Sequence, residues 1–158
     1  MSPENRRLHA ALDVTQRGID RLSSSLVDDI DLLSADRAVD SKEALRATDA
    51  FVQRFQQVLE HITHRLFPAI YRSETVGDRP PGLRALLIYL HEAGLIAEPR
   101  DWERRIELRN QLVHEYPIEE EDRVAAIAAM LVESRLMIDA FGATLDYVSK
   151  RQLLGDIE

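Results

Sequence analysis

The sequence predicts an all-α protein, an up-and-down helical bundle of about five helices. Apolar residues recur at three- and four-residue spacing over most of the 158 residues. No stretch of useful length alternates between apolar and polar residues, as a half-buried strand would. The length fits a single domain over residues 1–158.

The first two predicted helices are long. Apolar spacing predicts the first over about residues 4–33, although Gly18 in its interior weakens the expectation of an unbroken helix. Ser41 is a suitable cap for the second helix, which is expected to run to about Phe67. Pro68 follows, and proline is poorly tolerated inside a helix.

Three further helices follow the loop over residues 73–82. The third is expected over residues 83–93, with Gly94 as its stop. Pro99 suits the first position of the fourth helix, which is expected to end near Val113 because Pro117 prevents its regular continuation. The last spans about residues 119–150, and its acidic first turn suits the helix dipole.

The last helix is apolar nearly all round over residues 124–132. Such a helix is usually buried on more than one side. Two placements stay open at this point: a central position within one bundle, or a second burying surface supplied by a partner chain.

Composition restricts the function. The 20 basic and 28 acidic residues give a net charge of −8, which weighs against nonspecific coating of nucleic acid. Without cysteine, disulfides and thiolate nucleophiles are excluded. No apolar leader and no run long enough to cross a bilayer is visible, so we expect a cytoplasmic protein. His61 and His64 lack a third ligand at convincing spacing, so no metal or other cofactor is expected.

The most informative stretch covers residues 109–116, RNQLVHEY. Arg109 can hold a phosphate with a planar fork of donors, and His114 can move protons near neutral pH. On an ideal helix these two side chains would lie about 140° apart and would not converge. Pro117 instead favours a helix end close to His114, or a site completed by another chain.

These residue types suit cleavage of RNA, whose own 2′-hydroxyl can attack the neighbouring phosphate. Such an enzyme removes one proton, donates another and stabilises charge on the phosphoryl oxygens. One histidine does not easily serve as base and acid in the same step, so a symmetric dimer with two copies of His114 in one cleft is a hypothesis. The alternative is structural: Arg105 and Arg109 pair with acids such as Asp101, and His114 complements the helix dipole.

The motif resembles the signature of HEPN-domain ribonuclease toxins of the HepT type. Their pattern is an arginine, four residues, a histidine, any residue and a tyrosine, which corresponds here to Arg109, His114 and Tyr116. Asn110 and the string LVHEY are also typical, and residues 83–96, LRALLIYLHEAGLI, are similar to the short helix that precedes the motif helix.

The resemblance implies a homodimeric HEPN-like bundle that cleaves tRNA or mRNA without a metal, as the toxin of a type VII-like pair. It implies a cognate minimal nucleotidyltransferase (MNT) antitoxin that can attach AMP to Tyr116. Arg109 would stabilise charge on the phosphate, and His114 would act as general acid and base. Asn110 would orient the phosphate or His114, and Arg105 would extend the RNA-binding surface. The competing expectation is a non-catalytic helical partner that presents substrate to a nucleotidyltransferase.

Overall fold

The computed structural model describes residues 1–33, 41–113 and 119–155, and it contains only helices and turns there. The elements are α1 (Pro3–Asp28), α2 (Lys42–His61), the π-helical turn η1 (Ile62–Leu66), α3 (Phe67–Glu74), α4 (Leu83–Glu92), α5 (Pro99–Val113) and α6 (Glu120–Lys150). The predicted all-α fold class is confirmed.

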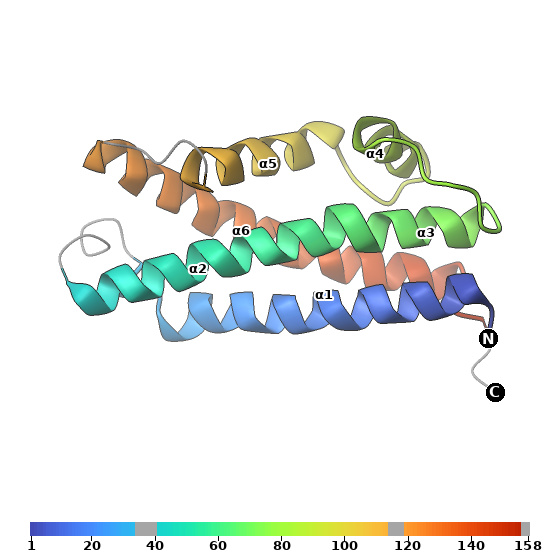
Figure 1. The fold of residues 1–158 in the computed structure, drawn as a ribbon, viewed down its shortest axis with the longest axis horizontal. Helices are drawn as coiled ribbons and strands as arrows, with labels where there is room; N and C mark the ends of the chain where they lie inside the picture. Colours follow the sequence, from blue (N-terminus) through green and yellow to red (C-terminus); the bar gives the residue numbers. More distant parts are fainter. Residues whose placement is uncertain (34–40, 114–118, 156–158) are drawn as a thin grey trace.

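The helices pack as a bundle around the rod formed by α2, η1 and α3 (Figure 1). α1 lies antiparallel along one side of this rod and α5 lies along the other, whereas α4 runs across the rod direction and contacts α3 and α5. The long α6 contacts α1, α2 and α5. α5, which carries Arg109, packs against both α2 and α6.

The core is built from the inward faces of all the helices. Its largest fully buried side chains include Phe51, Phe55 and Phe67 of the central rod. α1 runs unbroken through Gly18, where a Cβ atom would lie 3.1 Å from Cγ2 of Val58. Glycine therefore serves here as the point of close approach between α1 and α2, which outweighs its poor helix propensity.

The predicted end of the second helix before Pro68 is wrong, because the helical rod continues through α3 to Glu74. Proline cannot donate to the carbonyl four residues earlier, and its ring clashes with that carbonyl in a regular helix. The turn η1 accommodates Pro68 by widening: the N–H of Phe67 donates to the carbonyl of Ile62, five residues earlier. The helical backbone therefore continues through Pro68 without interruption.

The first helix is shorter than expected, since α1 ends at Asp28 and residues 29–33 form turns. Asp28, Asp29 and Asp31 lie at the negative end of the helix dipole, which disfavours further helix. Leu33 is nevertheless fully buried, so its apolar side chain reaches the core from a turn. Along the described ranges, no helix is long and apolar enough to cross a membrane.

The structure also shows how α6 uses its apolar surface. Ile127, Met130 and Met137 are buried, whereas Val132 and Leu136 are 55% and 45% exposed. Val132 and Leu136 are four residues apart and therefore lie on one face of the helix. One apolar face of α6 thus remains uncovered in the single chain.

Candidate functional site

The candidate site is carried by α5, which begins at Pro99 as predicted and is described as far as Val113. Its buried residues are spaced along one face: Trp102, Arg105, Leu108 and Leu112. Trp102 packs edge-on against Phe67 of α3, with ring centroids 5.0 Å apart. This contact attaches the start of α5 to the central rod.

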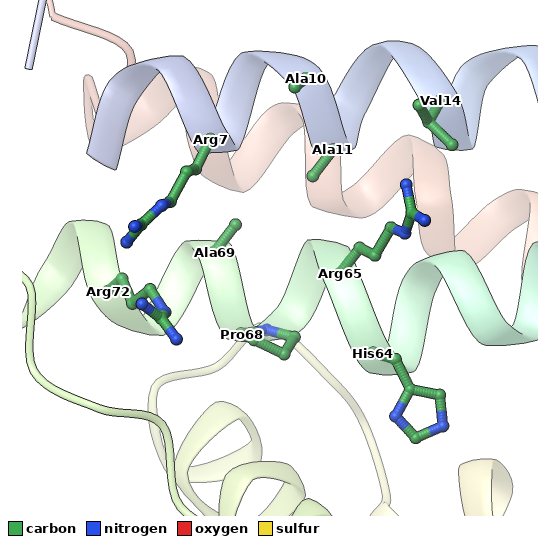
Figure 2. Close-up of a pocket in the computed structure, with 9 residues that line it drawn as sticks. All are labelled: Arg7, Ala10, Ala11, Val14, His64, Arg65, Pro68, Ala69 and Arg72. Atoms are coloured by element: carbon green, nitrogen blue, oxygen red, sulfur yellow. The ribbon is translucent and has the colours of Figure 1, made fainter. Parts of the chain in front are cut away.

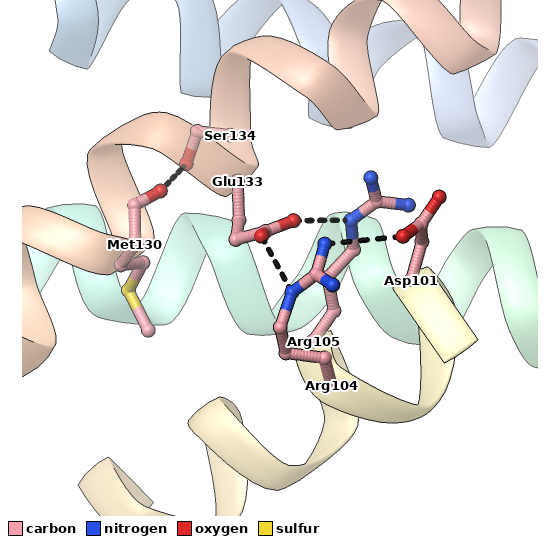
Figure 3. Close-up of polar contacts among 6 residues, drawn as sticks. All are labelled: Asp101, Arg104, Arg105, Met130, Glu133 and Ser134. Carbon is pink, nitrogen blue, oxygen red and sulfur yellow. Dashed lines mark hydrogen bonds and ion pairs between the residues drawn. The ribbon is translucent and has the colours of Figure 1, made fainter. Parts of the chain in front are cut away.

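Arg105 is a core residue, only 4% exposed. Its Nε donates to Oε2 of Glu133 on α6 at 2.9 Å (Figure 3). The guanidinium also lies over the ring of Trp102, with Cζ 4.5 Å from the centroid. This placement differs from the expected position on an RNA-binding surface, because a protein carboxylate already meets Arg105 inside the bundle.

Arg104 contacts the same carboxylate from the solvent side. Its Nε donates to Oε1 of Glu133 at 2.8 Å, and its Nη2 donates to Asp101 at 3.2 Å. The hydrogen bond to Glu133 is the main cause that raises the pKa of Arg104 above its ordinary value. Asp101 therefore pairs with Arg104, and not with Arg105 or Arg109 as the structural alternative supposed.

Arg109 lies one turn beyond Arg105 and is bound much more loosely. Its side chain is 19% exposed, and its Nη1 lies 3.5 Å from Oε1 of Glu60 on α2. Its Nε is buried and has no hydrogen-bond partner among the residues that the structure describes. A buried donor left unsatisfied costs about 1–3 kcal/mol, so this guanidinium is well suited to accept a further anion.

Of the other predicted site residues on the motif, the structure describes Asn110. Asn110 is half-buried in the last turn of the helix, directly after Arg109. His114 and Tyr116 lie outside the described residues, so their predicted roles rest on the sequence. In the sequence, both follow within three residues of Val113, the last described residue of the helix that carries Arg109.

Sequence reasoning did not identify Glu133 as the partner of Arg105 or Glu60 as the partner of Arg109. These two carboxylates give the two arginines their different environments. Glu133 had a detectable signal, because it follows Met130, Leu131 and Val132 in an otherwise apolar stretch of α6. A lone carboxylate in such a stretch is rarely buried unless it is paired. Glu60 is exposed and had no comparable signal.

No protein-family model matches the chain, and no curated protein matches it. Among solved structures, it is similar to the tri-AMPylated HEPN toxin of Shewanella oneidensis in complex with its MNT antitoxin. The TM-score is 0.56 at 19% sequence identity, over 90% of this chain and 99% of that one. The chain, with its arginine-bearing α5 packed against α2 and α6, therefore has the all-α fold of a HEPN toxin.

Proposed function

We propose that this chain is a HEPN toxin of the HepT type, a metal-independent endoribonuclease that acts as a homodimer. The observation that carries the proposal is Arg109, a half-buried guanidinium whose Nε has no partner among the described residues. It lies at the end of α5, where the motif continues into His114 and Tyr116. The shared fold with a HEPN toxin supports the same assignment.

The proposed reaction uses the RNA's own 2′-hydroxyl as the nucleophile. One copy of His114 takes the proton of that hydroxyl while the 2′-oxygen bonds to the adjacent phosphorus. The bond from phosphorus to the 5′-oxygen breaks, and the partner's copy of His114 gives a proton to the leaving oxygen. Arg109 stabilises the extra negative charge on the phosphoryl oxygens, and Asn110 orients the phosphate or His114. The products are a 2′,3′-cyclic phosphate and a 5′-hydroxyl end.

The exposed face of α6 supports the homodimer. Ala125, Ala129, Val132 and Leu136 are exposed and recur at spacings that place them together on one helix face. Ala129 also lines a shallow groove against Gln111 of α5, so this face adjoins the helix that carries Arg109. A second copy packed here would cover the apolar face and bring two α5 helices near one another.

Tyr116 is the proposed point of control by an MNT antitoxin. Its hydroxyl oxygen would attack the α-phosphorus of ATP and release pyrophosphate, which leaves AMP on the tyrosine. The similar toxin from Shewanella oneidensis is itself tri-AMPylated and bound to an MNT antitoxin. An anionic group beside Arg109 and His114 would repel and obstruct RNA. The hydroxyls of Tyr89 and Tyr147 both donate to Glu74, which makes them poor competitors for AMP.

The test is cleavage of total RNA by the purified chain in the presence of EDTA. We expect wild type to produce 5′-hydroxyl ends and both Arg109→Ala and His114→Ala to lose at least about 10²-fold in rate. Arg84→Ala, which changes an exposed arginine of α4, is the matched control and should cleave normally. If unmodified wild type without any partner leaves RNA intact, the chain is instead a non-catalytic partner of a nucleotidyltransferase.

A further inference from the structure

A groove with a basic rim runs between α1 and the segment formed by η1 and α3, and Arg109 is not among its described lining residues. It has a volume of about 450 Å³. Arg7 extends into it from α1, and Arg65 extends from η1 towards α1 (Figure 2). Arg72, one helical turn beyond Ala69, lies across from Arg7 at the end of the groove opposite Arg65 (Figure 2). None of the described residues that line the groove is acidic.

Small side chains create the groove. Ala10, Ala11 and Ala69 occupy the facing positions of the two helical segments, and Pro68 adds a compact ring (Figure 2). Side chains of this size cannot fill the space between the two helix backbones. The floor is therefore apolar and shallow, while the guanidinium groups stand at its edges.

The charges of the groove are not neutralised by the protein. Arg7, Arg65 and Arg72 form no ion pair with any carboxylate that the structure describes, although the chain carries a net charge of −8. Arginines 104, 105, 109, 123 and 151, in contrast, all lie within 4 Å of a carboxylate oxygen. Unpaired arginines around one hollow on an acidic body favour binding of an anion.

The basic character continues along the same seam beyond the groove. Burial, followed by the charge of Arg65, lowers the pKa of His61 of α2; Glu60 opposes this shift, and Arg21 adds a smaller lowering effect. From Arg7 to Arg21 the seam follows α1 for about 20 Å at 1.5 Å per residue. Because the cations form a line, an extended polyanion fits them better than a compact anion does.

We propose that this seam binds the phosphodiester backbone of the RNA substrate at a distance from the cleavage site; the inference rests on the proposed function for the identity of the polyanion. The planar fork of arginine matches phosphate oxygens, and the alanine and proline floor offers an apolar surface to sugars or bases. The groove would thus hold one part of the RNA while Arg109 engages the phosphate that is cut.

The test measures binding of an uncleavable single-stranded 2′-O-methyl RNA by fluorescence anisotropy at several salt concentrations. We expect the double variant Arg65→Gln with Arg72→Gln to raise Kd about tenfold or more at low salt. It should also reduce the slope of log affinity against log salt by about 1.4, or 0.7 for each lost phosphate contact. The matched control, Arg84→Gln with Arg135→Gln, changes two exposed arginines outside the groove and should leave the slope unchanged. Circular dichroism and Tm verify that both variants fold.

The outcomes separate this inference from the proposed function. In cleavage assays the groove variant should raise KM with little change in kcat, whereas Arg109→Ala should lower kcat. The inference would be overturned if Arg65→Gln with Arg72→Gln bound RNA with the affinity and the salt dependence of wild type. This holds even if cleavage still depends on Arg109. The inference would also be overturned if the groove variant lost binding to polyglutamate but bound RNA like wild type. An acidic protein would then be the ligand of the groove. RNA held by the groove but never cut would support the inference and contradict the proposed function.

Discussion

Arg105 of α5 and Glu133 of α6 form a buried ion pair, with Nε 2.9 Å from Oε2. The same carboxylate also accepts from Nε of Arg104, so one glutamate holds two consecutive arginines of α5 (Figure 3). These bonds fix the rotation of α5 about its own axis. They thereby determine where Arg109, four residues further along, presents its guanidinium.

The first prediction concerns the stability that depends on this pair. Glu133→Ala leaves the guanidinium of Arg105 buried without its carboxylate, so we expect it to lower the unfolding free energy by about 3–5 kcal/mol. Urea unfolding measures the loss. Glu107→Ala changes an exposed carboxylate on the same helix pair and should stay within about 0.5 kcal/mol of wild type. A double variant, Arg105→Met with Glu133→Leu, should recover most of the loss, since it removes both charges together. If the double variant remained as unstable as Glu133→Ala, an unpaired buried charge on Arg105 would not be the cause of the loss.

The second prediction concerns the loose contact between Glu60 and Arg109, whose nearest atoms are 3.5 Å apart. Glu60 is half-exposed and competes with a phosphate for the guanidinium. Glu60→Gln should therefore change stability by less than about 1 kcal/mol and lower KM for RNA by up to about fivefold. Glu103→Gln, on an exposed residue of α5, is the control and should leave KM unchanged. If Glu60→Gln abolished cleavage, Glu60 would belong to the catalytic machinery and not to a competing contact.

Local signals predicted much of the fold. α5 begins at Pro99 as expected, because a proline at the first helical position marks a helix start independently of packing. The continuation through Pro68 was not predictable in this way, since it depends on a widened turn held within the packed rod. The unbroken helix at Gly18 could not be predicted either. Glycine is needed there because of the close approach of Val58, which lies 40 residues away in sequence.

In the candidate site, too, local features could be predicted from the sequence, and contacts between helices could not. Arg109, Asn110, His114 and Tyr116 are neighbours in sequence, so the motif could be found without the structure. The different environments of Arg105 and Arg109 depend on Glu133 and Glu60, which belong to other helices. Helix periodicity cannot say which of two basic residues four positions apart meets a buried carboxylate.

A third prediction tests the proposed dimer through the exposed face of α6. Val132→Asp with Leu136→Asp places two charges on this face, so we expect at least a tenfold weaker dimer by sedimentation and a parallel loss of RNA cleavage. Leu145 is also exposed on α6, but nine residues from Leu136 put it about 180° away around the helix. Leu145→Asp should therefore leave assembly and cleavage intact. A double variant that stays dimeric would locate the interface elsewhere.

The last prediction concerns stability at high pH. The hydroxyls of Tyr89 and Tyr147 both donate to the carboxylate of Glu74. Burial, followed by the hydrogen bond to Glu74 and its negative charge, raises the pKa of Tyr89 from 10.0 to about 12, and the same causes raise the pKa of Tyr147. Ionisation is therefore harder in the folded chain than in the unfolded chain. The stabilisation is complete below pH 10 and is lost as pH rises through 12.

We expect the unfolding free energy to fall between pH 10 and 12. Between pH 7 and 9 the two tyrosines should contribute little change, because both stay protonated. Tyr89→Phe should flatten part of the alkaline decline and cost about 1 kcal/mol at neutral pH, because one hydrogen bond to Glu74 is lost. Tyr71→Phe is the control: Tyr71 packs edge-on against Tyr89, with centroids 4.8 Å apart, but does not donate to Glu74. Urea unfolding from pH 7 to 12 distinguishes the variants. An alkaline decline that Tyr89→Phe leaves unaltered would place its cause outside the cluster, since removing a hydroxyl that titrates in this window must change the number of protons released on unfolding.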